Sequence, residues 1–330
     1  MIQTHHDKRS PRPINQRGFV TALLIILVLL SQAAPAWSAG NPSYFPEYTT
    51  SLYIAGSGNA AFNLRFEDLL KQQLGPTVRV DTYSQEKSAA HPETLVITLG
   101  SHALNRVQQQ QPRPPTLALM VDNRQFAPYQ GRSGASVSAI FYNPPLLYQV
   151  LLGHLILPQA THIAVLATPD ELETYNTSQQ QFSQFGLSLQ VYVVEDKGAL
   201  IGTLSRALSY GDFLLGTPNP AIFNPRTIKH ILLTTYRRNR ILIGPNRAFV
   251  NAGSLASVYA PIPVIISDTL RYYHQFRATG QLPEPGFTTD FAIAVNRQVA
   301  RSLNIPLEDP KTLEESLRNL LETLPRNETP

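Results

Sequence analysis

Several polar loops in this sequence directly follow apolar, strand-like segments, and their hydroxyl, amide and backbone N–H groups are suited to binding a small polar molecule. The first loop, Gly56-Ser57-Gly58-Asn59, offers hydroxyl and amide donors to a carboxylate. Two more begin at Ser101 and His102 and at Tyr142 and Asn143. In open parallel sheets, ligands bind outside the carboxyl ends of the strands, where loops gather backbone N–H groups and helix N-termini. The sequence therefore predicts that these loops form one wall of a ligand site.

The same rule selects a second set of loops further along the chain. These loops supply Thr168, the turn Gly216-Thr217-Pro218-Asn219, Phe223 and Asn246. The aromatic rings of Tyr142 and Phe223 are placed to stack on a planar ligand. Structural roles are open alternatives, because Asn59 can cap a helix, His102 can begin one at the surface, and the aromatic rings can pack in the core.

Motifs for catalysis, nucleotide binding and metal binding are missing from the sequence. The histidines are scattered, and neither an H-E-x-x-H pair nor a G-x-S-x-G elbow occurs. The loop at Gly56 lacks the lysine of a P-loop and the third glycine of a dinucleotide fingerprint. The chain has no cysteine, which excludes disulfides, thiolate metal sites and a lipid-modified cysteine. We therefore predict a protein without catalytic residues, metal or cofactor.

Residues 1–38 have the three zones of a secretory signal peptide. Basic residues precede an apolar run at residues 19–30, and small residues around Ala34-Pro35-Ala36 follow it. A membrane anchor is the alternative, but the apolar run is shorter than the ~20 residues that span a bilayer. Cleavage after Ala36 or Ser38 would release a protein that is not lipid-anchored. We expect it in the periplasm, with secretion beyond the cell as an open alternative.

The charge balance argues against a nucleic-acid partner. The formal net charge of +4 comes largely from the leader, and 23 basic and 22 acidic residues follow Ala36. The densest basic cluster, Arg237-Arg238-Asn239-Arg240, lies at the expected end of a helix, where cations interact favourably with the helix dipole. We expect a nearly neutral mature protein that binds no nucleic acid.

Short β-rich segments alternate with amphipathic segments, which predicts an α/β fold of parallel sheets flanked by helices. The expected strands are 51–55, 78–81, 95–99, 116–121 and 137–142, followed by 163–167, 187–194, 213–215 and 241–243. The segment Asn143-Pro144-Pro145 separates the two groups and places proline at a helix start. We predict two lobes, residues 39–142 and 143–243, with this segment as the first crossover between them.

The segment from Gly211 to Tyr259 carries the most informative pattern. A strand at 213–215 runs into Gly216-Thr217-Pro218-Asn219-Pro220, and a helix-like segment follows. A second strand at 241–243 runs into Gly244-Pro245-Asn246, and the stretch closes with Gly253-Ser254-Leu255-Ala256-Ser257-Val258. In this order of elements the chain resembles the periplasmic substrate-binding proteins of ABC importers, in the group that includes aromatic-amino-acid binders. The resemblance covers about residues 51–305 and implies the two-lobed type I periplasmic-binding-protein fold.

The resemblance also implies how the rest of the chain is distributed. It implies that residues 244–280 return to lobe 1 and that residues 281–308 are associated with lobe 2. Residues 309–330 are expected to form a C-terminal amphipathic helix and tail, because leucines recur there on one helical face. We expect that face to cap the body of the protein rather than to recruit a partner.

One position departs from the family pattern. Family members commonly carry an aspartate in the turn after the strand that matches 213–215, suited to pairing with an α-ammonium. This chain has Asn219 there, and an amide supplies no charge. Either another acid such as Asp122 or Asp170 substitutes for it, or the ligand is not a free amino acid.

The resemblance implies a monomeric periplasmic component of an ABC importer. Two lobes would close over a small organic ligand, such as an amino acid or an aromatic compound, and deliver it to a membrane permease. A ligand-sensing module of a membrane signalling receptor is the alternative, because both functions need the same cleft and differ in the partner. A periplasmic hydrolase that uses Ser101 or His102 is less favoured.

Overall fold

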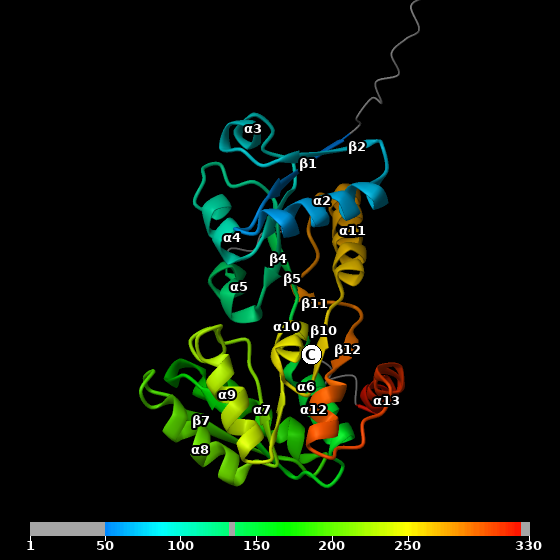
Figure 1. The fold of residues 1–330 in the computed structure, drawn as a ribbon. Helices are drawn as coiled ribbons and strands as arrows, with labels where there is room; N and C mark the ends of the chain where they lie inside the picture. Colours follow the sequence, from blue (N-terminus) through cyan, green and yellow to red (C-terminus); the bar gives the residue numbers. More distant parts are fainter. Residues whose placement is uncertain (1–49, 132–135, 325–330) are drawn as a thin grey trace, which may run out of the picture. The chain divides into compact units, whose positions relative to one another are not determined.

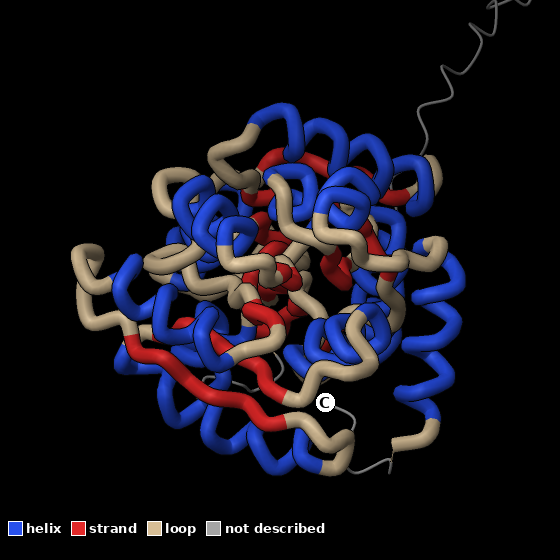
Figure 2. The backbone as a smooth tube through the Cα atoms, turned by 60° about the horizontal axis from the view of Figure 1, so that its bottom comes forward, coloured by secondary structure: helices blue, strands red, loops and turns tan. Residues whose placement is uncertain are grey.

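The computed structural model describes residues 50–131 and 136–324. The predicted signal peptide, residues 1–38, lies outside the described residues, as does the end of the predicted C-terminal tail. The described residues form two six-stranded sheets, which define lobe 1 and lobe 2 (Figure 1). Figure 2 shows helices around most of the strands. The prediction of two mainly parallel sheets flanked by helices is confirmed.

Lobe 1 is a parallel sheet in the order β11-β5-β4-β3-β1-β2. Its strands are β1 (Thr50–Ala55), β2 (Val78–Thr82), β3 (Val96–Leu99), β4 (Thr116–Val121), β5 (Val137–Phe141) and β11 (Gly286–Phe287). Its helices are α2 (Ala60–Leu74), α3 (Gln85–Ala90), α4 (Ser101–Gln108), α5 (Asn123–Gln130) and α11 (Ile262–Thr279). Every residue of β3 and β5 is buried, as expected for parallel strands that helices cover on both faces.

Lobe 2 repeats this strand order, as β12-β10-β9-β8-β6-β7. Its strands are β6 (His162–Ala167), β7 (Ser188–Val193), β8 (Phe213–Leu215), β9 (Ile241–Ile243), β10 (Ala256–Tyr259) and β12 (Ala292–Val295), the last antiparallel to β10. Its helices are α6 (Leu146–Ile156), the 3-10 helix η1 (Pro169–Glu171), α7 (Leu172–Ser183), α8 (Leu200–Tyr210), α9 (Ile228–Arg237), α10 (Arg247–Ala252), α12 (Arg297–Ser302) and α13 (Pro310–Glu322). Both sheets are doubly wound, so their ligand sites are expected at the carboxyl ends of the strands.

Within the part of the chain that the structure describes, the backbone passes between the lobes three times. The first crossover, residues 142–145, joins β5 to α6; the second, residues 260–261, joins β10 to α11; the third, residues 288–291, joins β11 to β12. The expectation that the chain returns to lobe 1 near Gly244 is wrong for the strand β10. This strand pairs with β9 and β12 in lobe 2, because its apolar residues Ala256 and Val258 complete the buried sheet there. Similarly, the segment 281–308 is divided, with β11 in lobe 1 and β12 in lobe 2.

Buried polar side chains hold the second and third crossovers. Gln149 on α6 accepts a hydrogen bond from the Val258 backbone N–H at 2.9 Å and donates one to the Val258 carbonyl oxygen at 2.7 Å. Asp268 on α11 accepts hydrogen bonds from the backbone N–H and the hydroxyl of Thr289, at 2.8 and 2.9 Å. Gln149 and Asp268 are both almost fully buried, so these bonds satisfy groups that have little access to water.

The C-terminal helix α13 is part of lobe 2. Its residues Leu313 and Leu317 are buried in the same core cluster as residues of α6 and β12. On the same helix, Arg318 pairs with Asp290 at 2.5 Å and lies over the ring of Phe291, which places it against the third crossover. The apolar face of α13 therefore covers part of the lobe 2 core. Among the described helices, none is both long enough and apolar enough to cross a membrane.

Replacing a buried leucine of α13 tests how much this helix stabilises lobe 2. Leu317→Ala should lower the free energy of unfolding by about 2–5 kcal/mol, because it removes a fully buried side chain and leaves a cavity. Asn319 is exposed on the same helix, so Asn319→Ala should change it by less than about 0.5 kcal/mol. Urea unfolding followed by circular dichroism measures both variants. Small and equal losses would contradict a core role for α13.

Candidate ligand-binding site

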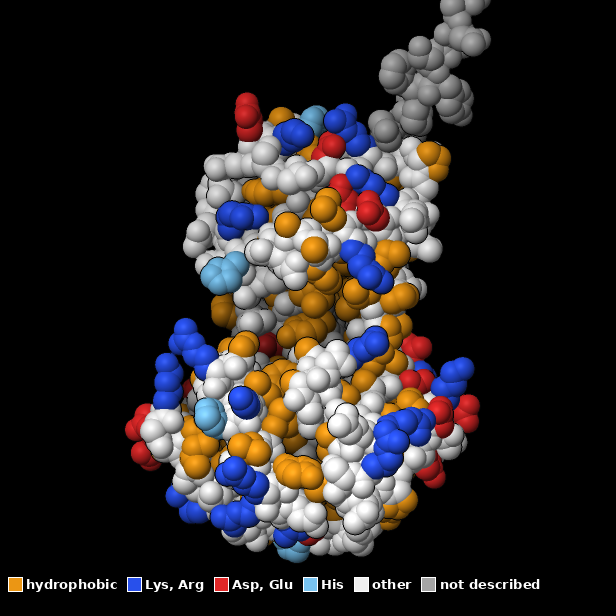
Figure 3. All heavy atoms as spheres, viewed as in Figure 1, with side chains coloured by type: hydrophobic (Ala, Val, Ile, Leu, Met, Phe, Trp, Pro, Cys, Tyr) orange, Lys and Arg blue, Asp and Glu red, His pale blue; other side chains and the backbone are white. Residues whose placement is uncertain are grey.

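A cavity of ≈ 440 Å³ lies between the two lobes. Lobe 1 lines it with Asp122, Arg124 and Gln125, and lobe 2 lines it with Thr168, Asp170, Glu171, Tyr175 and residues 218–221. These residues follow the carboxyl ends of β4, β6 and β8, the edge where doubly wound sheets bind ligands. Figure 3 shows a hollow between the lobes in which hydrophobic side chains are also visible.

Local hydrogen bonds fix the lobe 1 wall of the cavity. The carboxylate of Asp122, the N-cap of α5, accepts a hydrogen bond from the Gln125 N–H at 2.8 Å. In return, the side-chain oxygen of Gln125 accepts one from the Asp122 N–H at 3.1 Å. This capping box satisfies N–H groups that the start of a helix leaves without partners. It holds Arg124 in the first turn of α5, at the cavity.

The lobe 2 wall is built around one buried carboxylate. Thr168-Pro169-Asp170-Glu171 forms a second capping box, in which Oε2 of Glu171 accepts hydrogen bonds from the N–H and the hydroxyl of Thr168 at 2.9 and 3.0 Å. The same oxygen accepts a hydrogen bond from the side-chain amide of Asn219, which also donates to the Thr168 hydroxyl at 2.9 Å. Only 3% of the Glu171 side chain is exposed. The turns after β6 and β8 are therefore joined through Glu171.

Arg124 joins the two lobes across the cavity. Its guanidinium donates from Nη1 to Oε1 of Glu171 and from Nη2 to Oδ2 of Asp170. A side-chain hydrogen bond from Thr168 lowers the pKa of Asp170, and the charge of Arg124 acts in the same direction. Asp170 is exposed, so its pair with Arg124 contributes little to stability, whereas an ion pair to the buried Glu171 is costly to break.

Tyr175 lines the cavity with a buried phenol. Burial is the main cause that raises the pKa of Tyr175, and the negative charge of Glu171 raises it further. The phenol therefore keeps its proton at physiological pH and remains able to donate a hydrogen bond.

Of the predicted site residues, Thr168 and Asn219 meet in this cavity. Thr217 is fully buried next to the cavity turn, and Asn143 is buried at the first crossover. Sequence reasoning missed Arg124, Glu171 and Tyr175, although it had considered Asp122 and Asp170 as acids. The spacing T-x-x-E from Thr168 to Glu171 is the signal of a capping box, and it could have identified Glu171.

The remaining predicted residues do not line the cavity. Asn59 caps α2 by accepting a hydrogen bond from the Phe62 N–H at 3.1 Å, and Asn246 caps α10 by accepting one from the Ala248 N–H at 3.0 Å. The other loop residues lie in the Gly56 loop (Ser57 and Gly58), at the start of α4 (Ser101 and the exposed His102) and at the first crossover (Tyr142, whose pKa is raised by burial). The ring of Phe223 is 4% exposed in the core of lobe 2 and packs edge-on against Phe249, so it does not line the cavity.

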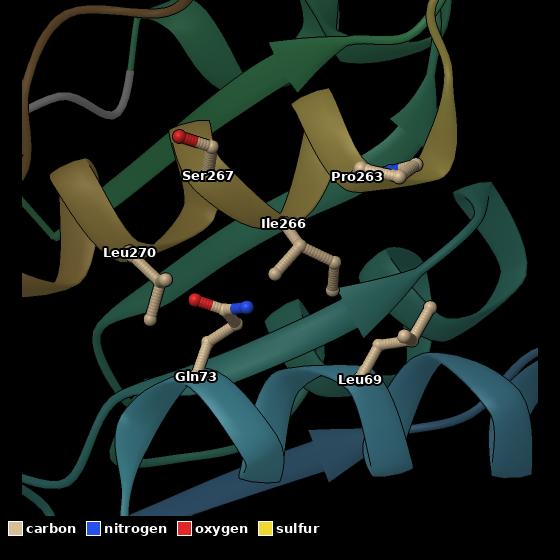
Figure 4. A pocket seen from close by; sticks show the side chains of 6 residues that line it. All are labelled: Leu69, Gln73, Pro263, Ile266, Ser267 and Leu270. Atoms are coloured by element: carbon tan, nitrogen blue, oxygen red, sulfur yellow. The ribbon is translucent and has the colours of Figure 1, made fainter.

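A second cavity, of ≈ 200 Å³, lies within lobe 1 between α2 and α11. Figure 4 shows Leu69 and Gln73 on α2 facing Ile266 and Leu270 on α11 across it. It is mainly apolar and belongs to one lobe, and none of the predicted site residues lines it. Within residues 50–131 and 136–324, no group of three or more His, Asp or Glu side chains is placed to hold a metal ion.

Comparison with solved structures identifies the fold. The ABC domain in complex with L-Trp from Streptococcus pneumonia has a TM-score of 0.57 and 14% identity, over 80% of this chain and 97% of that chain. A conserved domain protein from Vibrio cholerae has a TM-score of 0.59 and 13% identity, over 81% and 98% of the two chains. A ligand-free, open substrate-binding protein with adhesive properties from Clostridium difficile has a TM-score of 0.62 and 13% identity, over 79% and 96%.

These likenesses define the class of the fold. The chain has the two-lobed type I fold of periplasmic binding proteins, and this prediction is confirmed. No protein-family model matches the sequence, and no curated protein matches it.

Asn219→Asp tests the arrangement around Glu171. The substitution replaces an amide donor with a second carboxylate, and repulsion between the two raises the pKa of one of them above its value in the unfolded chain. The substitution should therefore leave the free energy of unfolding unchanged below a pH of about 4. As the pH rises above that value, the loss should grow to at least about 2 kcal/mol at neutral pH.

Urea unfolding at pH 4 and pH 7.5 measures this cost. The exposed Asn319 is the matched control, and Asn319→Asp should have little effect at either pH. A loss of stability in Asn219→Asp that is the same at both pH values would contradict the proposed contact between two carboxylates.

Proposed function

We propose that this protein is a periplasmic binding protein that closes two lobes over a small organic molecule and delivers it to the permease of an ABC importer. One observation carries the proposal: a cavity with several charged side chains, whose walls come from the carboxyl-end loops of both lobes. A ligand that contacts both walls stabilises the closed arrangement over the open one, so binding shifts the population toward closure.

The crossovers supply the mechanical basis of this proposal. Because three short segments join the lobes within residues 50–131 and 136–324, rotation at these segments would change the separation of the cavity walls without repacking either core. Gln149 and Asp268 hold the elements on either side of the crossovers, so the bending is confined to a few residues. The closed form would then present a surface made by both lobes to a permease.

A binding function without catalysis is consistent with the cavity. Its lining residues include no histidine and no serine, and Tyr175, the buried phenol, keeps its proton. The carboxylates of Asp170 and Glu171 are engaged by Arg124 rather than placed against a nucleophile. We infer that these groups hold and orient a ligand.

The proposed location is the periplasm, with export directed by the signal peptide expected in residues 1–38. The proposed working form is a monomer, since a clamp of two lobes within one chain supplies both walls of the site. L-Trp is bound by one structural neighbour and supports an amino acid or aromatic compound as the kind of ligand to test first.

A thermal-shift panel on the mature protein tests this function. Amino acids, polyamines, aromatic acids, nucleosides, sugars and oligopeptides should be screened at millimolar concentration. A ligand at about 100 times its Kd stabilises the folded protein by roughly 2.7 kcal/mol, so a selective rise of several degrees in Tm is expected for one class.

A variant that fills the cavity shows whether such a ligand binds there. Ala221 is exposed at the cavity, so Ala221→Trp should abolish the rise in Tm while the protein stays folded. Ala89 is exposed on α3, away from the cavity, and Ala89→Trp should bind ligand as the wild type does. A panel without any response, or a response that Ala221→Trp retains, would contradict the proposed site.

A further inference from the structure

We propose that Glu171 is the cation-binding group of the cleft and that Arg124 occupies it when no ligand is bound, so that the protein selects small molecules carrying a guanidinium or ammonium group. This inference rests on the proposed function, because it names the ligand class of the same cavity. Arg124 then acts as an internal competitor that a ligand cation displaces.

The two oxygens of the Glu171 carboxylate have different partners. Oε2 accepts three hydrogen bonds, all from lobe 2: two from Thr168 and one from Asn219. Oε1 accepts a hydrogen bond from Arg124 alone among the described residues, and Arg124 belongs to lobe 1. Lobe 2 therefore fixes the carboxylate through one oxygen and presents the other oxygen to the cavity.

Arg124 is suited to being displaced. Its side chain is 48% exposed, and its second partner, Asp170, is 66% exposed, so that half of the interaction is weakened by water and salt. Any separation of the lobes moves the guanidinium of Arg124 away from Glu171. Thr168 and Asn219 stay with Glu171, because all three residues belong to lobe 2. Separation of the lobes leaves Oε1 of Glu171 without its cation, so a ligand that supplies a cation can take the place of Arg124.

The charges that line the cavity favour a cation over an anion. The lining residues include three carboxylates, on Asp122, Asp170 and Glu171, and one cation, Arg124. Displacement of Arg124 leaves acceptors on two adjacent residues, Asp170 and Glu171. A guanidinium can donate one N–H to each of them as Arg124 does, and an ammonium can donate three N–H bonds.

Arg124→Gln tests the inference directly. Agmatine and butylguanidine serve as guanidinium probes, and butylurea serves as an uncharged probe that matches butylguanidine in shape and carries no ammonium group. In the wild type, at least one guanidinium probe should bind at least about tenfold more tightly than butylurea. Removal of Arg124 should tighten the binding of that guanidinium probe about tenfold further, because the competitor no longer occupies the site, and should leave the binding of butylurea unchanged. Isothermal titration calorimetry measures each affinity.

Two further variants make the result specific. Glu171→Gln keeps the shape of the side chain but removes its charge, so the preference for the guanidinium probe over butylurea should disappear. Arg106 is exposed on α4 of lobe 1 and does not line the cavity, so Arg106→Gln should behave as the wild type. Arg124→Gln changes a half-exposed side chain and remains informative if Glu171→Gln does not fold.

The outcomes separate this inference from the proposed function. If neutral ligands bind in a manner sensitive to Ala221→Trp while Arg124→Gln gains no affinity for guanidinium probes, the inference is wrong and the proposed function stands. An anionic ligand whose binding is lost in Arg124→Gln would also overturn the inference, because Arg124 would then contact the ligand itself. If no compound binds to the wild type or to Arg124→Gln, both are wrong.

Discussion

The burial of one carboxylate, that of Glu171, determines most of the candidate site. Taking an ionised carboxylate out of water costs several kcal/mol unless hydrogen bonds and a nearby cation offset the loss. The chain offsets it with the Thr168 capping box, the Asn219 amide and the guanidinium of Arg124. The first two tie the turns after β6 and β8 together within lobe 2. The guanidinium of Arg124 links lobe 2 to the start of α5 in lobe 1. One buried charge therefore fixes the local turns of lobe 2 and also contacts lobe 1.

The strand order explains why these loops can meet at all. Each lobe places its first five strands in the same doubly wound order, so the loops after β4, β6 and β8 all leave the carboxyl ends of their sheets. Capping boxes at Asp122 and Thr168 then fix how the chain turns from strand to helix on each side. The second crossover returns the chain to lobe 1, and the third returns it to lobe 2. There the C-terminal helix α13 packs on the core and holds the third crossover through Arg318. The candidate site is therefore built from local hydrogen-bonded turns placed on two sheets of the same strand order.

Much of the fold could be predicted from the sequence, because buried parallel strands appear as continuous apolar runs between turn residues. The expectation that residues 256–259 lie in lobe 1 failed for a physical reason: a short, mostly buried segment fits either sheet, and its pairing with β9 and β12 decides between them. Thr168 and Asn219 were predicted because each follows a strand. Glu171 and Arg124 were not predicted, because each lies in the first turn of a helix, where a charged side chain usually faces water. The lobe 1 residue that reaches Glu171 is determined by how the two lobes are placed relative to each other, and no local sequence pattern encodes that placement.

The position of Glu171 also explains the departure at Asn219. The resemblance to importer binding proteins implies an aspartate in the turn after β8, yet in this chain that turn lies against Glu171, which follows β6. Two carboxylates this close cannot both ionise without a large cost, so the site can accommodate one buried acid between the two turns. With the acid on Glu171, the residue at 219 has to donate a hydrogen bond, and an amide does so while matching the aspartate in shape. The asparagine is thus consistent with a cavity whose buried negative charge lies on the turn after β6 rather than on the turn after β8.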